Sequence, residues 1–187
     1  MNRKIKVTLL GEQNTGKTSI IIRLMREIFK RTDATIGATY ASYKNDDIIY
    51  DLWDTAGSER FMALTPMYYR GSDIIVLVYD LSNLSSMDKV KFFLNRIREE
   101  LKKEYAIILV GNKLDLIDNK DNIRNPLKDE HNIDFVCISA KTGENFADFK
   151  EILFKHGKYF FNNKQLVHTD LDKIELIKSD NDKKCEC

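Results

Sequence analysis

The sequence has few cysteines, no long apolar run and almost no net charge. Its three cysteines, Cys137, Cys185 and Cys187, are too few for a disulfide framework in a chain of 187 residues. No apolar run approaches the roughly 18 to 20 residues of a membrane-spanning helix, and residues 1–4 contain no hydrophobic signal segment. A formal net charge of +1 gives no support for nucleic-acid binding, which calls for a basic face. These absences favour a globular protein in a reducing, intracellular setting.

The sequence also lacks internal repeats and any linker rich in proline or glycine. With 43% hydrophobic and 32% charged residues, the chain can bury a substantial core. The composition changes once, near Asn162, where a mixed charged segment begins. We therefore predict one folded domain over residues 1–162 and a flexible tail over residues 163–187.

The segment Gly11–Thr18 has the pattern G-x-x-x-x-G-K-[ST] of a phosphate-binding loop, and we refer to it as the phosphate loop. It lies between an expected strand and an expected helix, as this loop requires. Its glycines let backbone N–H groups point at phosphate oxygens, and the helix adds the positive end of its dipole. Lys17 is expected along the β- and γ-phosphates and the Thr18 hydroxyl on Mg2+. An ordinary glycine-containing turn is the alternative. The expected nucleotide-binding residues here are Asn14, Thr15, Gly16, Lys17, Thr18 and Ser19.

Hydrophobic patterns predict strands that alternate with helices. Strands are expected over residues 4–10, 38–44, 47–53, 74–79, 105–110 and 134–138. Helices are expected at 19–28, 87–101 and 146–160, and the first should bury Ile20, Ile21, Leu24, Met25 and Ile28. This order predicts a doubly wound α/β domain. Its six-stranded, mostly parallel sheet should have one antiparallel edge strand, helices on both faces and a ligand at the carboxyl ends of the strands.

Asp54 ends one expected strand, in the run Asp54-Thr55-Ala56-Gly57. A carboxylate at this place can hold Mg2+, directly or through water, as the second acidic element of a phosphate-loop nucleotide hydrolase. Gly57 can offer its N–H to the γ-phosphate because no side chain blocks the approach. The alternative is that Asp54 only caps a helix.

The run Asn112-Lys113-Leu114-Asp115 follows another expected strand and predicts the base. The Asp115 carboxylate can accept two N–H bonds from guanine, whereas adenine presents an acceptor there and would leave the carboxylate unpaired. The Lys113 stem is expected over the ring plane. The turn Ser139-Ala140-Lys141 should bind the base carbonyl through a backbone N–H. Together the two motifs favour a guanine nucleotide, and they argue against a phosphate-loop ATPase or small-molecule kinase.

From residue 4 to residue 161 the chain resembles a small GTPase of the Ras superfamily, and within it the Rab family. The resemblance rests on Trp53–Gly57, on Glu59-Arg60-Phe61, on Tyr68–Ser72 and on Leu77–Leu81. It implies that residues 1–162 form a small G-domain, a GTP/GDP-binding switch that regulates vesicle traffic.

The resemblance also implies roles for residues that no pattern above identifies. Phe29 would stack on guanine, and Thr35 would be a second Mg2+ ligand beside Thr18 and Asp54. Segments around Thr35 and from Gly57 to residue 70 would be switches that the γ-phosphate orders. GTP hydrolysis would involve Lys17, Thr35, Gly57 and the residue after Gly57.

That residue, Ser58, departs from the family pattern, which usually has a glutamine that orients the attacking water. A hydroxymethyl group is too short to do this directly, so we expect slow intrinsic hydrolysis. The alternative is a GTP-locked scaffold that recruits effectors and hydrolyses almost nothing. The segment from Phe29 to Thr35 is also about one residue shorter than usual, and Gln13 and Asn14 stand where relatives often have small residues.

The tail ends in Cys185-Glu186-Cys187, which matches the Cys-x-Cys terminus on which Rab proteins carry two geranylgeranyl groups. Residues 163–187 hold five lysines and six acidic residues, so the tail is not a polybasic membrane patch. Two lipid chains provide stable anchoring without such a patch. The alternatives are two free thiols or a pair of metal ligands.

The resemblance implies a monomer that cycles between the cytosol and the cytoplasmic face of an intracellular membrane. Its expected partners are an exchange factor, a GTPase-activating protein, an escort or dissociation-inhibitor protein, and effectors.

Overall fold

The fold is built on a six-stranded sheet with the strand order β2-β3-β1-β4-β5-β6. The computed structural model describes the backbone of residues 4–130 and 132–182, and the side chains of this range as far as residue 164. The strands are β1 (Lys4–Gly11), β2 (Ala38–Asn45), β3 (Ile48–Thr55), β4 (Ile74–Asp80), β5 (Ala106–Asn112) and β6 (Ile133–Cys137). β2 pairs antiparallel with β3, and every other neighbouring pair is parallel. The predicted fold class is confirmed.

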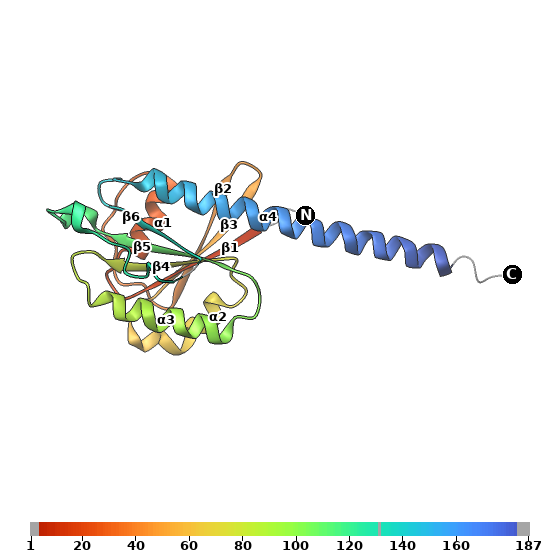
Figure 1. Cartoon of the computed structure of the whole chain (residues 1–187), viewed down its shortest axis with the longest axis horizontal. Helices are drawn as coiled ribbons and strands as arrows, with labels where there is room; N and C mark the ends of the chain where they lie inside the picture. The colour runs from red at the N-terminus through yellow and green to blue at the C-terminus, as the bar shows by residue number, and fades with distance from the viewer. Residues whose placement is uncertain (1–3, 131, 183–187) are drawn as a thin grey trace.

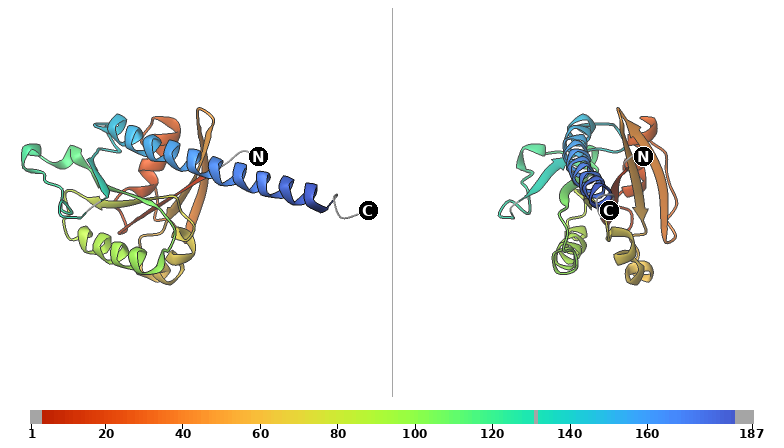
Figure 2. Two further views of the ribbon diagram at one scale, coloured as in Figure 1. Left: turned by 45° about the vertical axis from the view of Figure 1, so that its right-hand side comes forward. Right: turned by 90° about the vertical axis from the view of Figure 1, so that its right-hand side faces the viewer.

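Helices cover both faces of the sheet (Figure 1). The helices α1 (Lys17–Arg26) and α4 (Phe146–Asp182) pack on one face, and α2 (Thr65–Tyr69) and α3 (Ser86–Glu100) on the other. The end-on view of Figure 2 shows the sheet between the two layers. Short 3-10 turns occupy Glu59–Leu64, Leu114–Leu116 and Lys120–Asn122. Since both faces are covered, every residue of β4 and β5 is buried, as the continuous apolar runs require.

The first helix differs from its prediction at both ends. It spans Lys17–Arg26 and stops at Glu27, whose φ of 57° is left-handed. Because the helix ends there, Ile28 lies beyond it and is 51% exposed, and Met25 in the last turn is 38% exposed. The predicted burial of these two side chains was therefore wrong. The other three apolar residues of the predicted face, Ile20, Ile21 and Leu24, are buried.

The last helix also runs further than its apolar pattern. α4 continues past residue 162 to Asp182, and its second half projects beyond the sheet (Figure 1). The composition change near Asn162 therefore does not mark the end of a helix, and the division of the chain at that residue stays a prediction. Cys185 and Cys187 lie outside the described residues. None of the helices in the described part of the chain combines the length and the hydrophobicity needed to cross a membrane.

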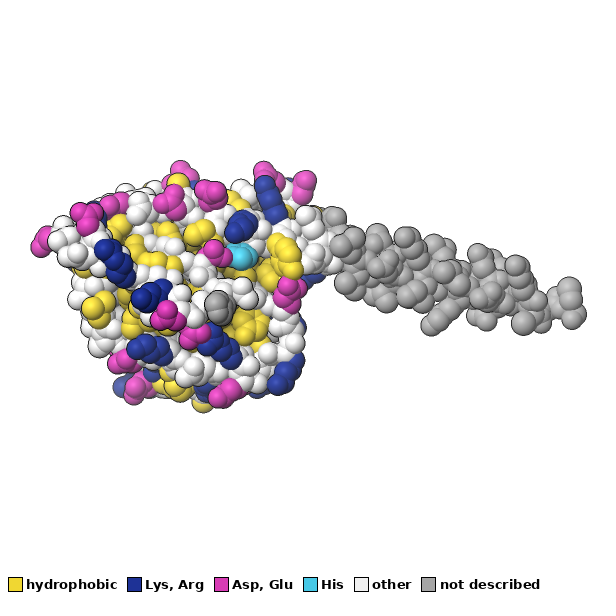
Figure 3. Space-filling view, in the orientation of Figure 1, with side chains coloured by type: hydrophobic (Ala, Val, Ile, Leu, Met, Phe, Trp, Pro, Cys, Tyr) yellow, Lys and Arg dark blue, Asp and Glu magenta, His cyan; other side chains and the backbone are white. Residues whose placement is uncertain are grey.

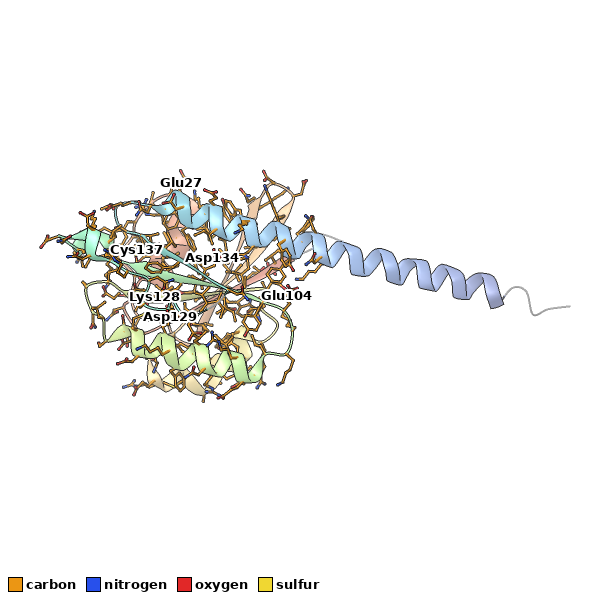
Figure 4. All side chains as sticks on the ribbon, viewed as in Figure 1. Glu27, Glu104, Lys128, Asp129, Asp134 and Cys137 are labelled. Atoms are coloured by element: carbon orange, nitrogen blue, oxygen red, sulfur yellow. The ribbon has the colours of Figure 1, made fainter. Side chains whose placement is uncertain are left out.

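Charged side chains of both signs are interspersed on the face of the domain shown in Figure 3. Several are paired across elements on this side. His156 of α4 lies 2.6 Å from Asp134 of β6, and Figure 4 shows Asp134 beside that helix. Glu27 lies near the first turns of α4, where its carboxylate pairs with Lys150 at 2.8 Å. These contacts tie α4 to the sheet and to the end of α1.

Candidate functional site

A cavity of about 470 Å3 lies where the loops after β1, β3, β5 and β6 meet. These strands are parallel, so their carboxyl ends share one edge of the sheet. The loop between α1 and β2 closes another side. The lining residues are Gln13, Asn14, Gly16, Lys17, Thr18, Ser19, Phe29, Arg31, Thr32, Asp33, Ala34, Thr35, Thr55, Gly57, Ser58, Asn112, Lys113, Asp115, Leu116, Ala140 and Lys141.

The phosphate loop connects β1 to α1 and brings backbone N–H groups to the cavity. Gly16 precedes the helix with a φ of 93°, a left-handed conformation that favours glycine. A Cβ at this residue would lie 2.2 Å from Nδ2 of Asn112, so only glycine lets the loop approach β5 this closely. Lys17, 5% exposed, donates to the carbonyls of Gly11 (3.1 Å) and Glu12 (2.8 Å). Burial lowers its pKa to about 8, so an anion beside this ammonium would stabilise its charged form.

Three oxygen-bearing side chains from three segments meet next to Lys17. The Thr18 hydroxyl donates to Oδ2 of Asp54 at 2.6 Å, and the Thr35 hydroxyl lies 3.2 Å from the same oxygen. The two hydroxyl oxygens are 3.1 Å apart. Asp54 is 2% exposed, and burial raises its pKa. Its other oxygen, Oδ1, has no hydrogen-bond partner among the described residues.

A buried carboxylate oxygen without a partner is costly unless a cation or donor completes it. Hydroxyl and carboxylate oxygens are also the ligands that Mg2+ prefers. The three side chains therefore fit a magnesium ion. Among the described residues there is no group of three or more His, Cys, Asp and Glu side chains that could hold a different metal.

The opposite end of the cavity is held by Asn112, at the end of β5. Its Nδ2 donates to the Thr15 carbonyl at 2.8 Å, and its Oδ1 accepts the Ala140 N–H at 3.0 Å. The Ser139 hydroxyl donates to Oδ1 of Asp115 at 2.6 Å. One asparagine thus joins the phosphate loop to the turn after β6, and that turn orients the carboxylate expected to read the base.

Lys113 is held by Asp80, a residue to which the sequence analysis gave no role. Its ammonium lies 2.6 Å from Oδ2 of Asp80, at the end of β4. Oδ1 of Asp80 accepts the backbone N–H and the hydroxyl of Ser82. Burial of Asp80 disfavours its ionised form, but the contacts with Lys113 and Ser82 outweigh it and lower the pKa of this carboxyl. Asp80 therefore fixes where the Lys113 side chain lies.

Most of the predicted site residues line the cavity, including Phe29, which is 40% exposed, as well as Gly57 and Ser58. Thr15, Asp54 and Ser139 do not; they are buried behind the wall and contact residues that form it. Seven lining residues carried no predicted role: Gln13, Arg31, Thr32, Asp33, Ala34, Thr55 and Leu116. Four of these lie between Phe29 and Thr35. Because both of those residues were predicted to contact the nucleotide, the segment between them could have been predicted to line the site as well.

Comparison with known proteins agrees with this geometry. The Ras family model matches residues 6–157. The chain is 38% identical over 163 residues to GTP-binding protein YPT53 of Saccharomyces cerevisiae, covering 80% of this chain and 74% of that protein. It is 37% identical over 159 residues to a putative ras-related protein Rab-5B of Dictyostelium discoideum, covering 81% and 74%. The ras-related protein RabJ of the same organism is 35% identical over 179 residues, covering 87% and 70%. The chain therefore belongs to the Ras family, as a Rab-family small GTPase.

Proposed function

We propose that this protein is a GTP/GDP-binding switch that regulates vesicle traffic and hydrolyses GTP slowly. One observation carries the proposal: a single cavity of about 470 Å3 joins the phosphate loop, the Thr18–Thr35–Asp54 cluster and the Asn112–Asp115 motif. A phosphate-binding end and a base-reading end in one cavity are what a nucleoside triphosphate requires.

Guanine is the proposed base. The Asp115 carboxylate would accept its two N–H groups, while Ser139 holds the carboxylate in place at 2.6 Å. Ala140 and Lys141 would contact the base carbonyl, and Phe29 and the stem of Lys113 would lie against the ring. Adenine would leave the Asp115 carboxylate facing an acceptor, which supports discrimination on the order of 10^4 or more.

Mg2+ is the proposed cofactor, held by Thr18, Thr35 and Asp54. When bound, it supplies positive charge to the β- and γ-phosphates. Thr35 lies in the segment between α1 and β2, so a contact of Thr35 with the ion would order this segment in the GTP state. This arrangement supports a switch whose effector-binding surface depends on the γ-phosphate.

Hydrolysis is proposed to be slow because Ser58 stands where a water-orienting glutamine is usual. Lys17 would neutralise charge on the γ-phosphate, and the Gly57 N–H would bind one of its oxygens. The Ser58 side chain lines the cavity but has no amide that could hold the attacking water in line. The second candidate function is a GTP-locked scaffold with negligible hydrolysis, which Ser58 also favours. An activating protein that inserts its own glutamine and arginine would restore turnover in the first case.

Membrane attachment is proposed through prenyl groups on Cys185 and Cys187. Two lipid chains give stable yet extractable binding at the cytoplasmic face of an intracellular membrane, and an escort or dissociation-inhibitor protein would carry the cytosolic pool. An exchange factor and effectors complete the proposed set of partners. Mass spectrometry of protein isolated from cells tests this part, and two free terminal thiols would contradict it.

The nucleotide proposal is tested by competition and by single-turnover hydrolysis. GTP and GDP should displace a fluorescent GDP analogue, whereas ATP should not at about a thousandfold higher concentration. Hydrolysis by the wild-type protein should be slow, Ser58→Gln should accelerate it, and Ser58→Ala should match the wild type. Displacement by ATP would contradict the guanine assignment. Equal fast hydrolysis by the wild type and Ser58→Gln would contradict the role given to Ser58.

A further inference from the structure

Arg23, in the middle of α1, donates hydrogen bonds to three backbone carbonyls. Its Nε lies 2.5 Å from the Ala140 carbonyl oxygen, and its Nη2 lies 2.7 Å from that of Lys141. Its Nη1 lies 3.3 Å from the carbonyl oxygen of Glu27, at the end of the same helix. Hydrogen bonds from a charged donor are stronger than those between neutral groups, and the planar guanidinium fixes two neighbouring carbonyls at once.

The two carbonyls across from α1 belong to the turn that faces the base end of the cavity. Ala140 and Lys141 line this cavity, and the N–H of Ala140 is bound by Asn112 at 3.0 Å. The turn is therefore held from two sides, by Asn112 through its N–H and by Arg23 through its carbonyls. The Lys141 ammonium also lies 3.5 Å from Asp115, so a shift of this turn would disturb the base-reading carboxylate.

The shape of the turn leaves space for the guanidinium. A Cβ at Gly143 would lie 3.0 Å from Nη1 of Arg23, closer than real Cβ contacts normally come. The position of Arg23 on α1 matters for a second reason. This helix begins with Lys17 and Thr18, so the element that contacts the phosphate end also holds the base end through Arg23.

We propose that Arg23 is a positioning residue that sets how long a guanine nucleotide stays bound. Arg23 is not one of the residues that line the cavity; it keeps the 139–143 turn in the conformation that orients Asp115. Without it, the turn would sample conformations in which the base is read poorly, and the apparent affinity would fall with the fraction of competent protein. The inference rests on the proposed function, namely that the cavity binds a guanine nucleotide.

The matched test compares Arg23→Met with Arg26→Met. Both remove one positive charge from α1, but Arg26 is exposed and has no hydrogen-bond or ion-pair partner among the described residues. We expect Arg23→Met to accelerate release of a fluorescent GDP analogue by about tenfold and Arg26→Met to stay within about twofold of the wild type. The release rate of Arg23→Lys should be intermediate, because one ammonium group can replace only some of the hydrogen bonds of the planar guanidinium.

Two further readouts separate positioning from a loss of folding. The preference for GDP over IDP, which lacks the exocyclic amino group that Asp115 would bind, should narrow in Arg23→Met. Single-turnover hydrolysis of GTP that is already bound should stay within about twofold of the wild type, since the phosphate end is unchanged. If Arg23→Met does not fold, the same two measurements on Arg23→Lys test the proposal.

Equal GDP release in Arg23→Met and Arg26→Met would overturn the inference. An unchanged GDP-to-IDP preference, with release and hydrolysis altered in parallel, would also overturn it, because that pattern indicates general destabilisation. Failure of the wild-type protein to bind GDP is a distinct result, which would contradict the proposed function itself.

Discussion

Tyr50 of β3 lies directly against Gly157 of α4. A Cβ at Gly157 would come within 2.1 Å of the Tyr50 hydroxyl oxygen and 2.5 Å of its ring carbon Cε1. The Tyr50 side chain is completely buried, and its ring packs against Tyr43 and Phe154 with centroid distances of 6.3 and 5.6 Å. Because the ring is buried and in contact with these neighbours, it could move away from α4 only by displacing them. The absence of a side chain at Gly157 sets how closely α4 approaches the sheet.

Gly157→Ala should destabilise the protein, although alanine is the better helix former. The helix-propensity gain is about 1 kcal/mol, whereas overpacking of a closed core costs about 1–3 kcal/mol. Because the clash is with a buried ring, we expect the overpacking cost to exceed the propensity gain, with a net loss of up to about 2 kcal/mol in the free energy of unfolding. Urea denaturation at one fixed GDP concentration measures it, since bound ligand also adds stability.

Tyr50→Phe is the matched partner of this substitution. The Tyr50 hydroxyl has no hydrogen-bond partner among the described residues, so its removal should change stability by less than about 1 kcal/mol. It also removes the nearest clashing atom, and Gly157→Ala should therefore cost less in the Tyr50→Phe background. Strictly additive effects in the double mutant would show that this contact does not limit the approach of α4.

The sequence predicted those parts of the site that are encoded locally. The phosphate loop, Asp54 and the Asn112–Asp115 run each lie at the carboxyl end of a strand, and parallel strands bring these ends to one edge of the sheet. No long-range information was needed to place them at one site. The packing of α4 against Tyr50 could not be predicted in this way, because the contact joins residues far apart in the chain.

The residues that hold the site in place were missed for the same physical reason. Arg23 contacts Ala140, 117 residues away, and Asp80 contacts Lys113 on another strand end. Asp80 lies in the Leu77–Leu81 run that carries the family resemblance, but no local pattern at Arg23 or Asp80 predicts these contacts. The end of α1 was missed because Glu27 adopts a left-handed conformation that glycine or asparagine would normally signal.

Removal of Mg2+ should act through Asp54. We expect chelation with EDTA to accelerate GDP release from the wild-type protein by about tenfold or more, since the proposed ion would supply positive charge to the phosphates. In Asp54→Asn the release should be fast already and respond little to EDTA. Asp51→Asn is the control: it removes the same charge from β3, at a residue whose carboxylate pairs with Lys4 at 3.5 Å. An EDTA response that is equal in both variants would contradict the magnesium role of Asp54.

Asp73 should contribute to the stability of the fold and not to nucleotide binding. It is 1% exposed, and its carboxylate accepts the Lys6 N–H at 2.8 Å and the ammonium groups of Lys103 at 3.2 Å and Lys164 at 2.7 Å. Asp73→Ala would leave the Lys6 N–H unpaired and should cost about 1–3 kcal/mol. Lys164→Met removes only a partly exposed partner and should cost less than about 1 kcal/mol.

Lys164 ties α4 to the start of β1, at the end of the sheet away from the cavity. Hydrogen exchange of the α4 amides near residue 164 should therefore rise in Lys164→Met and stay unchanged in Lys158→Met, an exposed lysine of the same helix. GDP release should remain at the wild-type rate in both variants. Faster GDP release from Lys164→Met would show that the contacts at this end of α4 affect nucleotide binding.

Arg31 is a cation of the cavity wall with no hydrogen bond or ion pair to the part of the chain that the structure describes. Of the four basic residues that line the cavity, Lys17 contacts two carbonyls, Lys113 contacts Asp80 and Lys141 contacts Asp115. Among the described residues, Arg31 has no hydrogen bond or ion pair with any of them, although it lies on the segment that leads to Thr35. Its charge is therefore available to an anionic ligand.

Arg31→Ala should weaken GTP binding more than GDP binding, because the triphosphate carries additional negative charge. We expect the ratio of GTP to GDP affinity to fall by about threefold to tenfold at low salt, and by less at high salt, since the site is open to solvent. Lys30→Ala removes the same charge one residue earlier, outside the cavity wall, and should leave the ratio unchanged. Identical ratios in the two variants would mean that the charge of Arg31 does not reach the phosphates. A lower ratio confined to Arg31→Ala would instead identify a positive charge, supplied by this chain, that favours the GTP state.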